Sequence, residues 1–286
     1  MINPDKIFAG SSLCLAVGLI TSLLSQALPP APPHTILGDV RDEFGKLLTA
    51  DGSKVQFSRA SRVIGEAAIL PPGRDHNYRM DLSIDLRLTG TSDYISTAVA
   101  SGEILSIGVD IGGVMHLPIE IGSSGRTVGA PAQSSRLNLT LGEDTDSDGL
   151  PDAWEISQLF YADISPGANG WDLALLNRND DFDKDGASNW TEYIAGTYAT
   201  DASSIHSLRI AALRDSEVEF RLYTIHGKSY QIQSSPDLRV WSNLDCRLGT
   251  GSGYTSVQTA STTGETTAFS PRPTHTGKTY FRLTIR

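Results

Sequence analysis

The chain has 286 residues, enough for two or three compact domains, and a formal net charge of -10. This charge argues against non-specific binding to nucleic acid, whose phosphates attract basic proteins. The acidic residues are concentrated in one place: the segment from Glu143 to Glu192 holds 13 of them against Arg178 and Lys184 only. The rest of the chain is close to neutral, so the central segment must accommodate most of the negative charge.

The first 27 residues have the pattern of a secretory signal peptide. Lys6 precedes an apolar run from Leu13 to Leu24, and Ser25-Gln26-Ala27 places small residues where signal peptidase cleaves. The run is short for a membrane span, although an uncleaved N-terminal anchor stays an alternative. After cleavage Cys246 is the only cysteine, so the exported chain would form no intramolecular disulfide.

A Pro-rich spacer at 28–33 leads into a first predicted β domain over residues 34–142. Apolar and polar residues alternate from Tyr78 to Leu86 and from Leu105 to Ile111, which predicts strands with one buried face. Gly112-Gly113 predicts a hairpin turn leading to Met115, Leu117 and Ile119. The hairpin from Gly38 to Gly45 resembles the first hairpin of transthyretin-like, carboxypeptidase-regulatory-like domains, which implies an antiparallel β-sandwich.

A second predicted β domain covers residues 205–286. Val218, Phe220 and Leu222 alternate with polar residues, as do Phe281, Leu283 and Ile285. We expect a small sandwich here too. The whole chain is therefore predicted to be mainly β, with two antiparallel sandwich domains flanking a small loop-helix module at 143–204.

This module contains a segment that fits a 12-residue calcium loop position by position. Ca²⁺ prefers six to eight oxygen ligands, and carboxylates at alternate positions, a turn glycine and a closing glutamate supply them. Gly149 makes the turn, and the predicted ligands are Asp144, Asp146, Asp148, the Leu150 carbonyl, Asp152 and Glu155.

The same pattern recurs 37 residues later, where Gly186 makes the turn. Its predicted ligands are Asp181, Asp183, Asp185, the Ala187 carbonyl, Asn189 and Glu192. Each loop runs into a segment with helical apolar spacing, whereas no helix is predicted before the first loop. Two complete loops predict two bound Ca²⁺ ions per chain.

These loops resemble thrombospondin type 3 repeats and the dockerin-like calcium repeats of secreted bacterial proteins. The resemblance is specific for about 60 residues of the calcium module, and it implies a secreted or cell-surface protein that binds calcium. Dockerins usually end their loops with Asp, so Glu155 and Glu192 do not favour a cohesin partner.

The other motifs in the sequence do not indicate a catalytic or metal-binding site. Gly227-Lys228-Ser229 lacks the upstream glycine of a P-loop and is predicted to be a turn that feeds a strand. Six histidines have no ligand spacing and are predicted to lie at the surface or at strand edges: His34, His76, His116, His206, His226 and His275. No nucleophile motif is present, so we expect a non-enzymatic structural or binding protein.

Two alternatives to that expectation remain. One is a carbohydrate-binding accessory protein using exposed aromatics such as Trp241, Tyr254 or Tyr280, with a polysaccharide or a cell-surface protein as partner. The other, weaker alternative is a secreted hydrolase.

Overall fold

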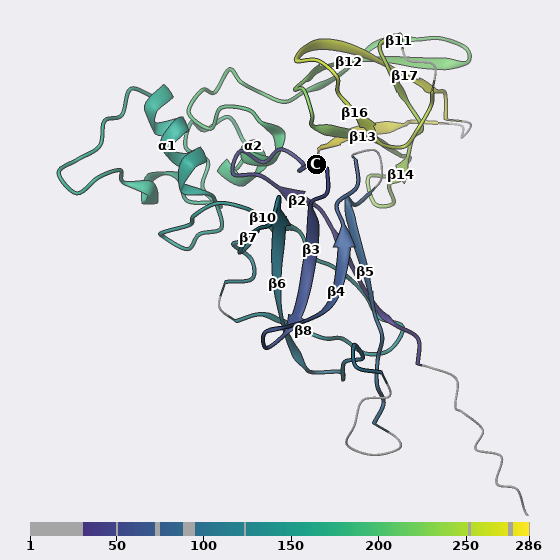
Figure 1. The fold of residues 1–286 in the computed structure, drawn as a ribbon. Coiled ribbons are helices and arrows are strands. Elements are labelled where there is room, and N and C mark those ends of the chain that lie inside the picture. Colours follow the sequence, from purple (N-terminus) through teal and green to yellow (C-terminus); the bar gives the residue numbers. More distant parts are fainter. Residues whose placement is uncertain are drawn as a thin grey trace, which may run out of the picture. The chain divides into compact units, whose positions relative to one another are not determined.

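A computed structural model describes residues 31–49, 51–71, 75–87, 95–122, 124–250, 253–273 and 277–285 (Figure 1). The predicted signal peptide lies outside these residues. Residues Ala31–Arg286 form one compact unit. The prediction of a mainly β fold with antiparallel sheets is confirmed, since most described elements are strands and most strand pairs are antiparallel.

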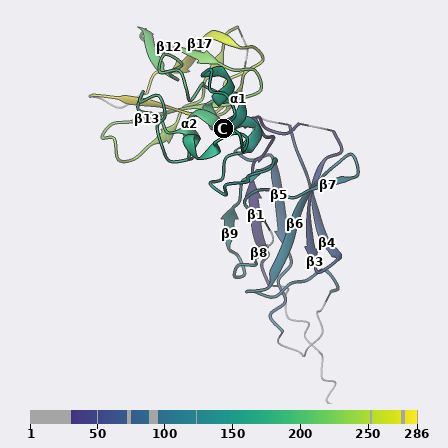
Figure 2. The same ribbon diagram turned by 90° about the vertical axis from the view of Figure 1, so that its left-hand side faces the viewer.

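The first β region is built on a sheet with the strand order β4-β3-β6-β7, with β8 also paired to β6 (Figure 2). Smaller sheets have the orders β5-β1-β9 and β10-β2. The strands are β1 (His34–Gly38), β2 (Val40–Arg41), β3 (Lys54–Arg59), β4 (Arg62–Ala68), β5 (Tyr78–Leu82), β6 (Ile104–Ile111), β7 (Val114–His116), β8 (Arg126–Thr127), β9 (Ser134–Arg136) and β10 (Leu139–Thr140).

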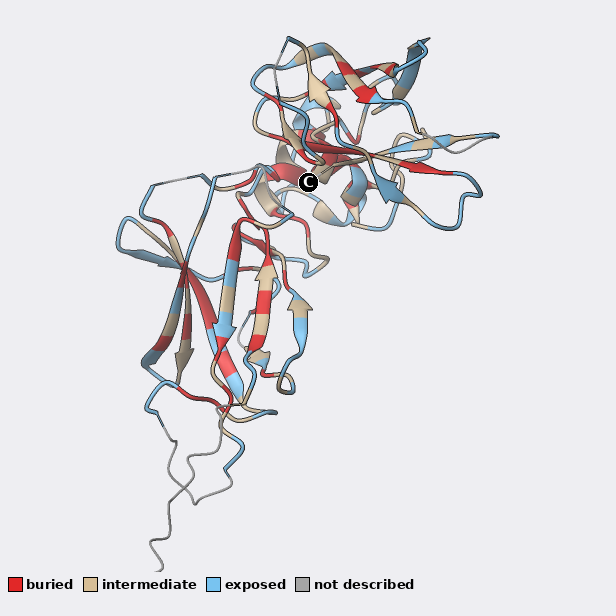
Figure 3. Ribbon diagram, turned by 90° about the vertical axis from the view of Figure 1, so that its right-hand side faces the viewer, coloured by how far each residue is buried: buried red, intermediate tan, exposed pale blue. Residues whose placement is uncertain are grey.

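Alternation along these strands buries one face of the main sheet (Figure 3). Val55 and Phe57 of β3 lie opposite Val109 and Ile107 of β6, and all four are fully buried. They belong to a hydrophobic cluster made only of residues from this first region.

Two predicted strands of this region are shorter than expected. Strand β5 ends at Leu82, because Ile84 changes partner and makes an isolated parallel bridge to Val99. Strand β7 ends at His116, and Met115 and Leu117 are exposed rather than buried. The reason is that β7 lies at an edge of its sheet and pairs only with β6.

The central segment contains helix α1 (Asp152–Tyr161), a 3₁₀ turn η1 (Leu173–Leu176) and helix α2 (Asn189–Ala195). Ser188 caps α2 by accepting a hydrogen bond from Thr191 N, and Gly196 ends it in the left-handed conformation. The buried face of these elements forms its own cluster around Leu150, Trp154 and Tyr193.

The last region contains β11 (Leu208–Leu213), β12 (Glu217–Thr224), β13 (Ser229–Ser235), β14 (Ser242–Asn243), β15 (Arg247–Leu248), β16 (Gln258–Thr259), β17 (Gly264–Pro271) and β18 (Tyr280–Ile285). One sheet has the order β11-β12-β17-β15, and a second has the order β14-β13-β16 with β18 paired to β13. A third cluster, centred on Phe220 and Ile232, contains residues of both sheets. That each β region is a two-layer sandwich stays a prediction.

No helix among the described residues is long and apolar enough to cross a bilayer.

Candidate metal centre

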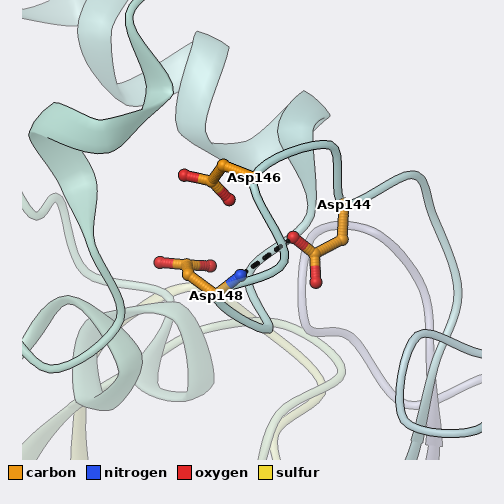
Figure 4. Close-up of side chains that lie close together, drawn as sticks. All are labelled: Asp144, Asp146 and Asp148. Atoms are coloured by element: carbon orange, nitrogen blue, oxygen red, sulfur yellow. Dashed lines mark hydrogen bonds between the residues drawn. The ribbon is translucent and has the colours of Figure 1, made fainter.

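The structure brings together the three leading aspartates of each predicted loop. The carboxylates of Asp144, Asp146 and Asp148 offer oxygens that lie within 4.8 Å of one another (Figure 4). Asp181, Asp183 and Asp185 do the same. Each group is therefore close enough for one cation to contact all three side chains.

Matching backbone hydrogen bonds shape the two loops. Gly149 N donates to Asp144 Oδ2 at 3.0 Å, and Gly186 N donates to Asp181 Oδ2 at the same distance. The residues after these glycines, Leu150 and Ala187, donate their N–H groups to Asp148 and Asp185, at 2.7 Å in both loops. The two loops thus share one conformation.

The turn in each loop depends on two residues in the left-handed region. Gly149 has a φ of 93° and Gly186 a φ of 100°, a conformation that glycine adopts at low cost. Two residues earlier, Ser147 and Lys184 have φ values of 63° and 65°. Non-glycine residues rarely adopt this conformation, and its recurrence at the same loop position shows that the loop geometry imposes it.

The side chains at position 9 of the two loops, Asp152 and Asn189, accept hydrogen bonds from the backbone of their own loops. Asp152 Oδ1 accepts a hydrogen bond from Thr145 N at 2.8 Å, and Asn189 Oδ1 accepts one from Phe182 N at 3.3 Å. Thr145 Oγ1 donates to the other oxygen of Asp152. Because these oxygens already accept protein hydrogen bonds, contact with a cation through water suits this position better than direct ligation.

Glu155 and Glu192, the predicted closing ligands, are buried in the protein at 0% and 1% exposure. Both carboxylate oxygens of Glu155 and Oε2 of Glu192 have no hydrogen-bond partner among the described residues. Glu192 Oε1 accepts one hydrogen bond, from Thr197 Oγ1 at 3.2 Å. A buried carboxylate without partners costs considerable free energy, so these oxygens point to a missing positive charge.

The electrostatics of the two glutamates agree with this. Burial, followed by repulsion from Asp146 and Asp148, raises the pKa of Glu155 to about 9. Burial, followed by repulsion from Asp183 and Asp185, raises the pKa of Glu192 to about 8. The aspartates that contribute to each shift belong to the same loop as the glutamate.

Three of the aspartates are affected in the same direction. Burial, more than any neighbouring charge, raises the pKa of Asp144, Asp148 and Asp183. Backbone N–H groups oppose this shift in each case, as they stabilise the charged form. The donor set consists only of oxygen atoms, which hard cations such as Ca²⁺ prefer.

Sequence reasoning missed Arg178, which connects the two loops. Its backbone N–H donates to Asp148 Oδ2 at 2.5 Å, and its guanidinium donates to Gly149 O at 3.1 Å. The same guanidinium lies over the ring of Trp190, 3.3 Å from its centroid, on the helix that follows the second loop. No local pattern marks this residue, because its partner in the first loop is 30 residues away.

Aromatic rings connect the helices that follow the loops. Tyr193 of α2 packs edge-on against Trp154 of α1, with ring centroids 5.5 Å apart, and lies 5.4 Å from Trp190. The Tyr193 hydroxyl donates to Asp42 O in the first β region at 2.9 Å. Tyr193, which follows the predicted ligand Glu192, therefore contacts both α1 and the first β region.

Lys228, which follows a predicted turn, contacts the same tyrosine. It is 3% exposed, and its ammonium donates to Gly45 O at 2.7 Å and to Tyr193 O at 3.1 Å. Burial, with repulsion from Arg41, lowers the pKa of Lys228 to about 7. This lysine joins the first β region, α2 and the start of β13, and no sequence signal identified it.

The histidines do not gather into a metal site in the described part of the chain. The prediction that they lie at the surface or at edges is wrong for His34, which is 1% exposed. Its ring lies in a polar pocket instead, where Nδ1 accepts a hydrogen bond from Gly129 N and Nε2 contacts Ser135 Oγ at 3.0 Å.

No family model, curated protein or solved structure matches this chain. The assignment of a function therefore depends on the site itself.

Proposed function

We propose that this chain is a secreted or cell-surface protein that binds two Ca²⁺ ions, one in each acidic loop. The ions would fold and stiffen the central module, and the protein would act as a structural or binding component rather than as an enzyme. The observation that carries the proposal is a pair of buried glutamates, Glu155 and Glu192, with carboxylate oxygens that lack hydrogen-bond partners among the described residues. Each belongs to a loop whose three leading aspartates lie together.

The donor chemistry supports calcium over other metals. Zn²⁺ and copper sites favour Cys or His, whereas both loops offer only carboxylate, amide and carbonyl oxygens. Mg²⁺ needs a compact octahedron and keeps several waters, whereas Ca²⁺ accepts more ligands in a flexible geometry. A glutamate that closes the loop with both oxygens fits this larger coordination shell.

Calorimetric titration of the mature chain with Ca²⁺ tests the proposal. We expect two ions per chain, with dissociation constants at or below roughly 10⁻⁴ M, because many carboxylates raise the affinity. Glu155→Gln and Glu192→Gln should each remove one site, since a neutral amide cannot close the loop as a carboxylate does.

Glu143→Gln is the matched control, because this exposed side chain precedes the first loop and is not a predicted ligand. It should leave both sites intact. If both glutamate variants still bind two ions with unchanged affinity, the ligand assignment is wrong.

A further inference from the structure

A cavity of about 690 Å³ begins next to the second acidic loop, at Thr197, and contains none of the predicted calcium ligands. One wall is the segment 196–207, which follows helix α2, and the other includes outward-facing residues of β12 and β17. On β12, Phe220 and Leu222 are buried whereas Arg221 and Tyr223 are exposed, so the polar face of the sheet lines the cavity. The calcium proposal does not use this cavity.

Two arginines in this wall are placed so that their positive charges repel each other. Arg209 of β11 and Arg221 of β12 are direct cross-strand neighbours, and both line the cavity. Like charges placed directly opposite each other in an antiparallel pair are destabilising. The guanidinium of Arg209 has no ion-pair or hydrogen-bond partner in the described chain, and Arg221 reaches only Glu265, at 3.8 Å across an exposed surface. An anionic ligand would offset this repulsion.

Aromatic side chains lie beside the arginines. Tyr223 of β12 is 51% exposed, and Tyr198 of the other wall is 44% exposed. Tyr161 packs edge-on against Tyr198, with ring centroids 5.1 Å apart, which restrains the Tyr198 ring. Exposed rings offer flat apolar faces, which suit the apolar face of a sugar ring.

His206 lines the same cavity, and its ring packs against the last β region. Its ring stacks on Tyr230, with centroids 5.5 Å apart and an interplanar angle of 13°. Both ring nitrogens are shielded from solvent, and neither has a hydrogen-bond partner in the described residues. Burial lowers the pKa of His206 to about 4, so the ring is neutral at pH 7 and adds no positive charge to the cavity.

We propose that this cavity binds an acidic saccharide, with Arg209 and Arg221 holding its carboxylate or sulfate group and Tyr198 and Tyr223 packing on its rings. Asp201 and Glu265 also line the cavity and can accept hydrogen bonds from sugar hydroxyls. The same two carboxylates would repel a polyphosphate such as a nucleotide. A ligand with many hydroxyls and few negative charges matches the mixed lining.

Calorimetry with the calcium-saturated mature chain tests this proposal, using three galactose-based probes. These are a galactotetraose that carries one galacturonate residue, a galactotetraose that carries one sulfate ester, and a neutral galactotetraose. At least one acidic probe should bind about tenfold or more tightly than the neutral one, because charge-assisted hydrogen bonds to two guanidiniums are lost in the neutral sugar. Binding of only one acidic probe would identify the carboxylate or the sulfate ester as the ligand group.

The double variant R209Q/R221Q should remove the preference for acidic probes, and R209K/R221K should keep part of it. Arg214→Gln is the matched control, because Arg214 lies on the same hairpin, pairs with Glu219 and does not line the cavity. Tyr223→Ala should weaken the binding of the acidic probes, whereas Tyr280→Ala should not. Thermal unfolding of each variant, followed by circular dichroism, verifies that the chain is folded.

Three results would overturn the proposal: no binding of either acidic probe, equal binding of the neutral probe, or unchanged affinity in R209Q/R221Q. All three differ from the outcomes that would contradict calcium binding, because the ion content is fixed and measured separately.

Discussion

Glu155 and Glu192 are buried among carboxylates, and this determines how each loop responds to pH. A buried glutamate whose pKa is raised stays protonated at neutral pH unless a cation stabilises its charge. In the metal-free chain the raised pKa values contribute stability below about pH 4.5, the unfolded value, and this contribution is lost as the pH rises through about 8 and 9. The metal-free module should therefore be more stable at pH 5 than at pH 9.

Calcium binding at pH 7 is predicted to release protons. Both glutamates begin mostly protonated and must ionise to bind the metal, so we expect about two protons per chain, with affinity that rises with pH. Calorimetric titrations in buffers of different ionisation enthalpy measure this number directly.

The variants that remove single sites provide the control. E155Q and E192Q should each lower the proton release by about one, because a glutamine has no proton to lose. Release of no protons by the wild-type chain at pH 7 would contradict the raised pKa values of the two glutamates.

At the level of the loop, the turn glycines keep the conformational strain of the shared turn low. Nothing lies within 4 Å of a Cβ built on Gly186, so Gly186→Ala introduces only the strain of a positive φ. This strain costs roughly 1–2 kcal/mol, and we expect it to weaken the second calcium site by about tenfold, with a smaller effect on the first. Calcium titrations that resolve the two sites measure this effect.

Gly149→Ala should affect the first site more strongly. A Cβ at Gly149 would lie 2.6 Å from Arg178 Nη1, so the guanidinium that connects the two loops must move as well. Gly253→Ala is the matched control, since Gly253 has no positive φ and no neighbour within 4 Å. Equal binding by all three variants would show that the turn glycines do not shape the sites.

The sequence predicted elements well where one face is buried and the other is wet. Strand β12 follows the alternation of Val218, Phe220 and Leu222 that identified it. Strand β13 was harder to recognise, because it is buried at six of its seven positions and shows no alternation. The extension beyond Leu82 was wrong because the change of partner at Ile84 depends on Val99, which is distant in sequence.

The candidate site was easier to predict than its surroundings. A calcium loop is encoded in 12 consecutive residues, so spacing alone predicted that the three leading aspartates of each loop lie together, as they do. That Glu155 and Glu192 close the loops as ligands stays a prediction. The roles of Arg178 and Lys228 could not be predicted from the sequence, because both residues act over long sequence separations. Lys228 contacts Gly45, 183 residues away, and only the folded chain brings these residues together.

At the scale of the whole molecule, the three separate hydrophobic clusters should respond differently to removal of the proposed ions. The central cluster is small, and it adjoins carboxylates that repel one another by roughly 4 kcal/mol per pair at 4 Å and an effective dielectric near 20. That repulsion is large beside the stability of a typical domain, about 5–15 kcal/mol. The other two clusters lack such charge density and have their own strands.

We therefore predict that chelation unfolds or loosens the central segment selectively. Hydrogen exchange and protease cleavage should increase between Glu143 and Ser203, whereas β5 and β12 should stay protected. Hydrogen exchange with mass spectrometry, with and without chelator, measures this. A chain from which both ions have been removed and which shows unchanged exchange across 143–203 would mean that the ions only decorate preformed loops.

Arg178 has one more consequence. Its backbone binds the first loop at Asp148, and its guanidinium rests on Trp190 beside the second. An ion bound in the first loop would also restrict the motion of this arginine. The second loop would then lose less conformational entropy when it binds its own ion. We expect the two ions to bind with positive cooperativity, and thermodynamic linkage requires each ion to favour the other by the same factor.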